Sequence, residues 1–173
     1  MSGKTNYAAR FKPDSKFKRK LDVVVGLIRR GDTFLLTQRA RGVHQGGLWE
    51  FPGGKLGLAE APEAGLIREI KEELGITVGI ERFFTLLRYA DDTHDVALHV
   101  YECSIKSGVP KSMEGQIMDW VTVSQMEKMP MPEANNQIVT RLKLEKTVAL
   151  GISDTKDFTL GRAGHEGPFA VRK

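Results

Sequence analysis

Apolar residues occur along the chain in short runs separated by glycine, proline or aspartate, which is the pattern of β-strands joined by turns. The first run, Leu21 to Ile28, is rich in β-branched residues, and Arg30-Gly31-Asp32 should join it to a hairpin partner that ends at Arg39. A polar loop over 40–47 follows, and Pro52-Gly53-Gly54 should break the short strand after it. We therefore expect strands over residues 21–28, 33–39, 48–51, 76–89, 94–105 and 120–123, with a turn at 90–93.

Two segments have the apolar spacing of helices instead. The first should begin near Pro62, because a first helical turn does not need the missing N–H, and should end before Gly75. The second is expected over residues 132–145. The side chains expected to face the core are Ile67, Ile70 and Leu74 on the first helix and Ile138, Val139 and Leu142 on the second. Strands around two helices predict an α/β (α+β) fold with a mixed sheet and a helix on either face.

The length of 173 residues suits one ordinary domain with terminal extensions. We expect a basic tail over residues 1–20, a folded domain over 21–145, and an irregular segment or short added strand over 146–173. Hydrophobic residues make up 40% of the chain, which is enough for a real core.

Positive charge is concentrated in the first twenty residues, which hold seven lysines and arginines against Asp14 alone. The whole chain has a net charge of +4, so a tail of +6 leaves the remainder at −2. Contact with nucleic acid or an anionic membrane is one interpretation of the tail. A solvated leader is the favoured one, because seven basic residues make only a weak electrostatic footprint for such a partner.

Several absences suggest a soluble cytoplasmic protein. No apolar run approaches the roughly 20 residues that span a bilayer, and no apolar block follows the basic start as in a signal peptide. Cys103 is the only cysteine, so an internal disulfide is excluded. We expect neither a membrane association nor a stable nucleic-acid partner, and the sequence carries no prediction of the oligomeric state.

The first predicted helix carries three glutamates on one side. Glu69, Glu72 and Glu73 are three or four residues apart, or adjacent, so their carboxylates should cluster and repel each other. Mg²⁺ prefers such oxygen ligands and would turn the repulsion into attraction. Arg68 precedes Glu69 in the sequence, so its side chain lies roughly 100° around the helix from that of Glu69. It can orient a glutamate or the preceding loop. For three glutamates alone, an ordinary solvated acidic face is the simpler hypothesis.

A glycine-containing loop makes the metal hypothesis the stronger one. Phe51-Pro52-Gly53-Gly54 leads directly toward the acidic helix, and glycine allows close approaches that a Cβ would block. Such a loop could direct a backbone carbonyl at the same metal ion. The combination of this loop with Glu60, Arg68 and the three helical glutamates is far more specific than any one of these features.

Together these residues resemble the signature of the Nudix hydrolase family, G-x5-E-x7-R-E-U-x-E-E-x-G-U with U aliphatic. The resemblance implies an α/β/α sandwich around a mixed sheet and hydrolysis of a diphosphate linkage. It implies that Glu69, Glu72 and Glu73 bind Mg²⁺, for which Mn²⁺ can substitute, that the Gly53 carbonyl adds a ligand, and that Glu60 and the catalytic-site Arg68 support them. The specified positions are filled by Gly54, Glu60, Arg68, Glu69, Ile70, Glu72, Glu73, Gly75 and Ile76.

Residues 22–144 are similar to the MutT-type branch, which hydrolyses oxidised purine nucleoside triphosphates. The motifs that carry this similarity are Leu36 to Ala40, Leu48 to Gly54, Glu114-Gly115-Gln116, Trp120 and Pro132 to Asn135. The resemblance implies that Arg39 and His44 contact the nucleotide and that Glu50, Phe51, Pro52 and Gly53 line the site. It also implies that Asn135 recognises the purine edge and that Glu114 joins the metal site.

Most of these residues have a simpler alternative role. Arg39 could be a solvated strand end, His44 and Glu114 could be solvated loop residues, Phe51 could be plain core, and Asn135 could be a helix cap. A separate departure is the presence of His99 and Tyr101 where the purine-specific relatives have larger aromatics, and of His94 where an arginine is expected. We expect these positions to lie near the base pocket.

The resulting hypothesis is a magnesium-dependent diphosphatase that releases a nucleoside monophosphate and pyrophosphate from a small-molecule nucleotide such as 8-oxo-dGTP. Either Glu69 or Glu114 would be the general base. The alternatives are a Nudix diphosphatase for dCTP or CTP, ADP-ribose or a dinucleotide, and a non-catalytic Nudix domain that senses nucleotides.

Overall fold

The computed structural model describes residues 18–43, 45–90 and 94–149. The elements are β1 (Arg19–Arg30), β2 (Thr33–Gln38), β3 (Trp49–Glu50), β4 (Gly53–Lys55), α1 (Pro62–Leu74), β5 (Thr77–Ala90), β6 (His94–Ser107), β7 (Ile117–Thr122), α2 (Val123–Met126) and α3 (Glu133–Ala149). The predicted strands and both predicted helices are confirmed, although several of their ends move.

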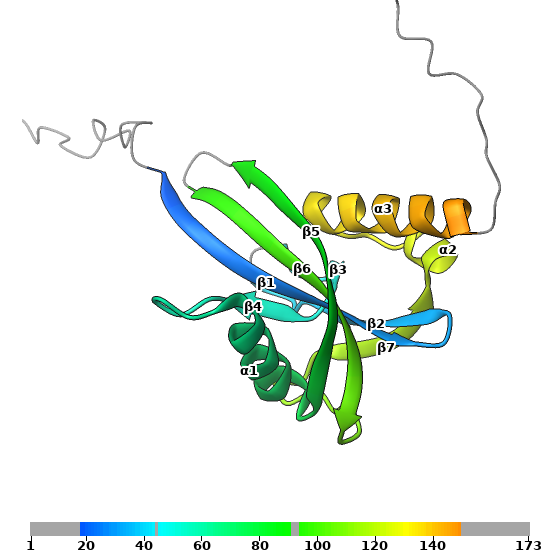
Figure 1. The fold of residues 1–173 in the computed structure, drawn as a ribbon, viewed down its shortest axis with the longest axis horizontal. Helices are drawn as coiled ribbons and strands as arrows, with labels where there is room; N and C mark the ends of the chain where they lie inside the picture. The colour runs from blue at the N-terminus through cyan, green and yellow to red at the C-terminus, as the bar shows by residue number, and fades with distance from the viewer. Residues whose placement is uncertain (1–17, 44, 91–93, 150–173) are drawn as a thin grey trace, which may run out of the picture.

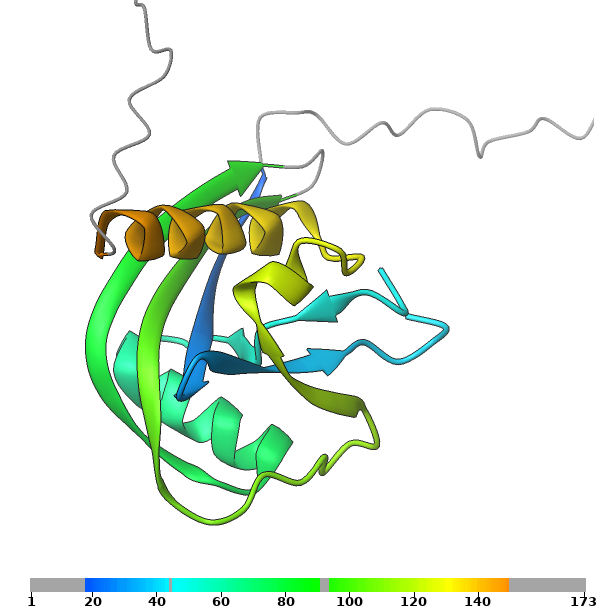
Figure 2. The same cartoon turned by 90° about the vertical axis from the view of Figure 1, so that its right-hand side faces the viewer.

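The strands form one mixed, seven-stranded sheet in the order β3-β2-β1-β6-β5. Only β1 and β6 run parallel among the paired strands, and β4 and β7 add to β1 and β2. Figure 1 shows α1 on one side of this sheet and α3 on the other. In Figure 2, β2 and β7 run across the direction of β5 and β6, so the sheet is strongly bent.

Each face of the sheet has its own hydrophobic core, which lies between the sheet and one helix. Leu66, Ile70 and Leu74 of α1 pack on one face, and α3 packs on the other face through the three residues predicted for it. On α1 the buried row includes Leu66, whereas Ile67 is only partly buried. These paired cores confirm the predicted mixed sheet covered by helices on both sides.

The glycine segment after Pro52 is a strand and not the predicted break. β4 pairs antiparallel with residues 23–25 of β1. A Cβ at Gly53 would lie 2.0 Å from the carbonyl oxygen of Val24, and Gly53 has a φ of 152°. Only glycine permits this approach, and two glycines give no apolar pattern from which a strand could be predicted.

Smaller differences occur at the other ends. β1 begins at Arg19, two residues before the predicted start. A capping box of Thr122 and Gln125 begins the unpredicted helix α2. α3 continues to Ala149 where an irregular segment was expected from residue 146, and residues 150–173 lie outside the described part, as do the tail residues 1–17 and turn residues 91–93. None of the described helices combines the length and apolar composition needed to cross a membrane.

Candidate active site

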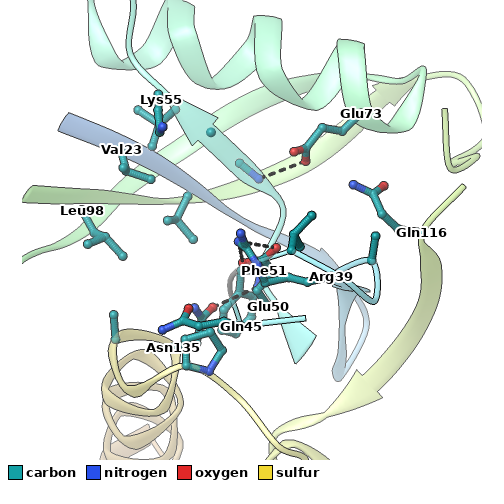
Figure 3. Close-up of a pocket in the computed structure, with 18 of the residues that line it drawn as sticks. Val23, Arg39, Gln45, Glu50, Phe51, Lys55, Glu73, Leu98, Gln116 and Asn135 are labelled. Carbon is teal, nitrogen blue, oxygen red and sulfur yellow. Dashed lines mark hydrogen bonds and ion pairs between the residues drawn. The ribbon is translucent and has the colours of Figure 1, made fainter. Parts of the chain in front are cut away.

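A cavity of about 400 Å³ opens between the start of α3, strands β1 and β4, and the loops after β2 and before β7. Figure 3 shows that it extends from Asn135 at one end to Glu73 on α1 at the other. Its walls on the sheet side include Val23 and Leu98. The predicted site residues that line it are Arg39, Glu50, Phe51, Gly53, Glu73, Glu114 and Asn135.

Other predicted residues do not line this cavity. Arg68, Glu69 and Glu72 lie beside it on α1, and Glu72 is the most exposed of the three glutamates considered as metal ligands. Pro52 is buried, and its carbonyl accepts a hydrogen bond from Gly26 N at 2.9 Å. Pro52 therefore contributes a backbone contact within the fold. His44 lies outside the described residues.

Glu73 is a half-buried acidic residue that lines this cavity. Its Oε2 accepts a hydrogen bond from Gly53 N at 3.3 Å. Burial raises the pKa of Glu73 to about 8 despite that bond, and the negative charges of Glu114, Glu69 and Glu50 add to the increase. A partly buried carboxylate with like-charged neighbours has an unfavourable charged form.

Arg68 connects the acidic helix to the loop before it. Its Nε and Nη2 donate to the two carboxylate oxygens of Glu60, both at 2.8 Å, and its Nη1 donates to Glu69 at 2.8 Å and to Glu72 at 3.2 Å. The guanidinium and the N–H of Gly57 together hold the pKa of Glu60 at about 2. The arginine therefore orients both a helical glutamate and the preceding loop.

The donor chemistry fits a hard divalent cation, although the carboxylates are not gathered around one point. Within the described ranges, no three acidic, histidine or cysteine side chains converge closely enough to share an ion, because Arg68 draws Glu69 and Glu72 to itself. Around Glu73, however, like charges oppose ionisation, and a divalent cation would relieve that repulsion with oxygen ligands of the kind it prefers. The contact that Gly53 makes with α1 runs through its N–H and not its carbonyl.

The loop before β7 is attached to the end of the acidic helix. Lys111 N donates to the carbonyl of Leu74 at 3.0 Å, and Met113 N donates to the carbonyl of Glu73 at 2.9 Å. The last carbonyls of a helix have no partner within it, so these bonds satisfy them. As a result Glu114, the residue after Met113, is held near Glu73.

Asn135 is anchored to the opposite wall of the cavity. It is only 8% exposed, and its Oδ1 accepts a hydrogen bond from Phe51 N at 3.0 Å. The side chain therefore does not cap α3, which excludes that simpler interpretation. Phe51 is 4% exposed and packs edge-on against Phe34, so it belongs to the core and to the cavity wall at once.

Arg39 and Glu50 form an ion pair at the rim of the cavity. Arg39 Nη1 lies 2.8 Å from Glu50 Oε2 and 3.1 Å from Oε1. Burial raises the pKa of Glu50 even though the pairing with Arg39 opposes this effect. Arg39 is thus not simply a solvated strand end.

The expectation that His99 and Tyr101 bear on the base pocket is wrong. Side chains alternate along a strand, and it is Leu98 of β6 that lines the cavity. Tyr101 packs in the α1 core and donates to Glu63 at 3.0 Å. His99 Nε2 lies 2.9 Å from Asp22 Oδ1. His94 is likewise not among the residues that line the cavity.

Several cavity residues escaped the sequence prediction. Lys55 follows the glycine pair directly, and Val23 and Leu98 could have been found from strand alternation once the buried face was known. Gln45 has no such signal, because it lies in a loop whose position relative to Asn135 depends on the tertiary structure. The residues missed include Val23, Gln45, Lys55, Tyr89, Leu98 and Gln116.

The chain is similar to proteins of one family. The NUDIX domain family model matches residues 23–141. The 8-oxo-dGTP diphosphatase of Escherichia coli K12 is 32% identical over 126 residues, covering 72% of this chain and 98% of that protein. The CTP pyrophosphohydrolase of the same organism is 29% identical over 117 residues, covering 68% and 87%.

Solved structures give the same result. The MutT protein of Methanosarcina mazei Go1 has a TM-score of 0.67 and 26% identity, and the match covers 75% of this chain and 96% of that one. The E. coli ORF135 protein has a TM-score of 0.65 and 26% identity, with 81% and 96% covered.

Proposed function

Because the chain belongs to the Nudix family, as a MutT-type hydrolase of diphosphate bonds, we propose that its substrate is an oxidised purine nucleoside triphosphate such as 8-oxo-dGTP. The products are the nucleoside monophosphate and pyrophosphate. The observation that carries this proposal is that one cavity holds a fixed carboxamide, Asn135, at one end and the carboxylate of Glu73 at the other. A nucleotide needs both, one for its base and one for the metal-bound phosphates.

Asn135 recognises the base in this proposal, and the structure limits how it can do so. Its oxygen already accepts from Phe51 N and keeps a second lone pair, whereas its Nδ2 group can only donate. Asn135 would then donate to a carbonyl oxygen of the purine.

Glu69, Glu72, Glu73 and Glu114 would hold the divalent ion, Mg²⁺ or Mn²⁺, and the Gly53 carbonyl would add a ligand. When bound, the ion supplies charge neutralisation on the diphosphate and a more acidic water. Arg68 would release Glu69 and Glu72 in part, while its bonds to Glu60 keep the loop before α1 in place. Glu69 or Glu114 would accept the proton of the attacking water.

A substrate panel tests the proposal. We expect pyrophosphate release with kcat/KM for 8-oxo-dGTP well above that for dGTP, CTP, dCTP, ADP-ribose and diadenosine tetraphosphate when Mg²⁺ is present. An equal rate on dGTP and 8-oxo-dGTP would contradict the oxidised-base assignment.

CTP is the second candidate, because a CTP pyrophosphohydrolase matches 68% of this chain at 29% identity. A kcat/KM that is highest for CTP or dCTP would replace the purine assignment and leave the reaction class unchanged.

A further inference from the structure

Gln116 lines the cavity, and neither the proposed metal ligands nor the base contact accounts for it. It lies just before β7, and Figure 3 shows it on the same side of the cavity as Glu73, away from Asn135. It also belongs to the motif Glu114-Gly115-Gln116, in which only Glu114 has an assigned role. This inference rests on the proposed function, since it concerns how Glu114 is prepared for the divalent ion.

The carboxamide of Gln116 bridges two residues of its own loop. Its Nε2 donates to Glu114 Oε2 at 2.9 Å, and its Oε1 accepts from the hydroxyl of Ser112 at 3.5 Å. An ionised carboxylate can only accept, so the amide nitrogen has to face Glu114, and the amide oxygen then faces a hydroxyl that can donate. The chemistry of the two partners therefore fixes the orientation of the amide.

The backbone is fixed on both sides of Glu114 and Gln116. Met113 N donates to the carbonyl of Glu73 at the end of α1, and Ile117 begins β7 opposite Gln38 of β2. Between these two points Gly115 has a φ of 80°, in the left-handed region that favours glycine. Three residues thus connect the acidic helix to the sheet, and the bond from Gln116 to Glu114 closes this short connection.

Holding Glu114 in advance has an energetic consequence for metal binding. Glu114 is exposed, and an exposed glutamate samples several rotamers, of which a bound ion must select one. A hydrogen bond to Oε2 reduces this entropic cost and leaves Oε1 for the ion or for an attacking water. Partners of this kind, which orient a metal ligand without contacting the metal, strongly affect metal affinity.

We propose that Gln116 is a positioning residue that holds Glu114 by Oε2 and so directs its Oε1 toward the diphosphate end of the cavity, where the divalent ion binds. Arg68 holds Glu69 in a comparable way, but through a charged group. The neutral amide of Gln116 leaves the full negative charge of Glu114 for the cation.

Three variants and one control separate the parts of this proposal. Gln116→Met keeps the approximate length of the side chain and removes both amide groups. Gln116→Glu replaces the donor with a like charge, which repels Glu114 but would itself be a suitable metal ligand. Glu114→Ala removes the residue through which Gln116 would act, and the double variant with Gln116→Met completes a mutant cycle. Gln137→Ala is the control, because Gln137 is exposed on α3 and does not line the cavity.

The contact is measured first in the protein without metal or nucleotide. The side-chain amide resonance of Gln116 in a ¹⁵N–¹H NMR spectrum should shift when Glu114 is replaced by alanine. Mn²⁺ affinity of the nucleotide-free protein, measured by electron paramagnetic resonance, should fall about tenfold in both Gln116→Met and Gln116→Glu. The double variant should bind Mn²⁺ no more weakly than Glu114→Ala alone, and the control should match the wild type.

Kinetics then test the consequence for the reaction. In Gln116→Met, kcat should fall about tenfold for 8-oxo-dGTP and dGTP together, because the two substrates share the same triphosphate. KM for both should change little, since the base contacts are intact. A general loss of structure would instead lower the melting temperature and leave the mutant cycle additive.

Each step has a result that would overturn the proposal. Mn²⁺ affinity that is retained or raised in Gln116→Glu would make this position a direct metal ligand. Additive losses in the double variant would show that Gln116 does not act through Glu114. Unchanged Mn²⁺ affinity and kcat in a folded Gln116→Met variant would reject any role in the site. A wild-type protein that cleaves no nucleotide rejects the proposed function, and the Mn²⁺ cycle then decides the role of Gln116 by itself.

Discussion

At the scale of single residues, the site depends on groups whose partners are already fixed in the protein. The oxygen of Asn135 accepts a hydrogen bond from Phe51 N, and the guanidinium of Arg68 donates to Glu60. The carboxylate of Glu73 accepts from Gly53 N. A substitution therefore acts on a ligand and on an internal bond at once. Conservative replacements that keep one of the two are the informative ones.

Glu73→Gln keeps the size of the side chain and removes its charge from the carboxylate cluster. We expect turnover to fall by two or more orders of magnitude, because the proposed metal site loses a ligand, while the protein remains folded. The measurements are kcat with saturating Mg²⁺ and the far-UV circular dichroism spectrum. Turnover near that of the wild type would remove Glu73 from the metal site.

The stability of the metal-free protein should depend on pH through the same residue. The pKa of Glu73 is raised to about 8 in the folded protein, whereas an unfolded glutamate titrates near 4.3. The folded state thus binds this proton more tightly, so the free energy of unfolding should fall as the pH rises from about 4.3 through about 8. Urea titrations in EDTA should show this slope in the wild type and a smaller one in Glu73→Gln. Equal slopes would show that Glu73 titrates normally.

Asn135→Asp separates base recognition from the internal bond. An aspartate keeps an oxygen for Phe51 N, so the buried N–H stays satisfied, but it loses the amide donors. We expect kcat/KM to fall for 8-oxo-dGTP and dGTP together, since both carry the base carbonyl to which Asn135 would donate. The matched change Gln137→Glu, at an exposed position of α3 that does not line the cavity, should leave both values near wild type. A loss confined to one of the two substrates would contradict a contact with a carbonyl that both bases carry.

At the scale of elements, the structure assigns different tasks to the two glycines of β4. Gly53 approaches the backbone of Val24, and Gly54 approaches the carboxylate of Glu69, where a Cβ would lie 2.1 Å from Oε2. A backbone cannot move aside as the end of a side chain can. Three residues of strand thereby connect the sheet to the acidic helix.

Gly53→Ala and Gly54→Ala form a matched pair that tests this division. Gly53→Ala should destabilise the fold by about 1–3 kcal/mol, because it strains the backbone against β1. Gly54→Ala should change stability less but reduce turnover strongly, because Glu69 is displaced. Thermal unfolding and kcat measured on both variants would check this, and a reversed order of effects would contradict it.

How much could be predicted from sequence follows the range of the contacts involved. Helix α1 and strands β1, β5 and β6 have strong apolar periodicity, so they were predicted nearly to their ends. The pairing of β4 with β1 and the bond between Asn135 and Phe51 join segments far apart in the chain. No local pattern encodes them. The predicted site residues were found from a motif. The position of Gln45 in the cavity and the face of the sheet on which Tyr101 lies could be found only from the fold.

At the scale of the whole molecule, the cavity lies within the described domain and is built from residues 23–135. The net positive charge of the N-terminal tail is outside this range. β1 nevertheless includes Arg19 and Lys20, which pair with His94 and Asp95 of β6. The tail considered in the sequence thus overlaps the sheet by two residues.

Two truncations should therefore differ. Removing residues 1–17 should leave kcat/KM for a small nucleotide unchanged, since the first cavity residue is Val23. Removing residues 1–20 also deletes the first two residues of β1 and should lower the melting temperature. Kinetics and thermal unfolding of both proteins test this. A large loss of kcat/KM in the shorter truncation would give the tail a role in catalysis.

The alternation along β6 has a consequence for how relatives of this protein can diverge. Leu98 faces the cavity, while His99 and Tyr101 face the side of α1 and contact Asp22 and Glu63. Neighbouring positions on one strand are thus subject to different constraints. Exchanges at 99 and 101 can occur together with changes in strand β1 and helix α1 while substrate choice stays the same. A change at 98 reshapes the cavity without disturbing the helix. A comparison of odd and even positions along β6 among relatives would therefore separate substitutions that preserve the fold from substitutions that alter substrate choice.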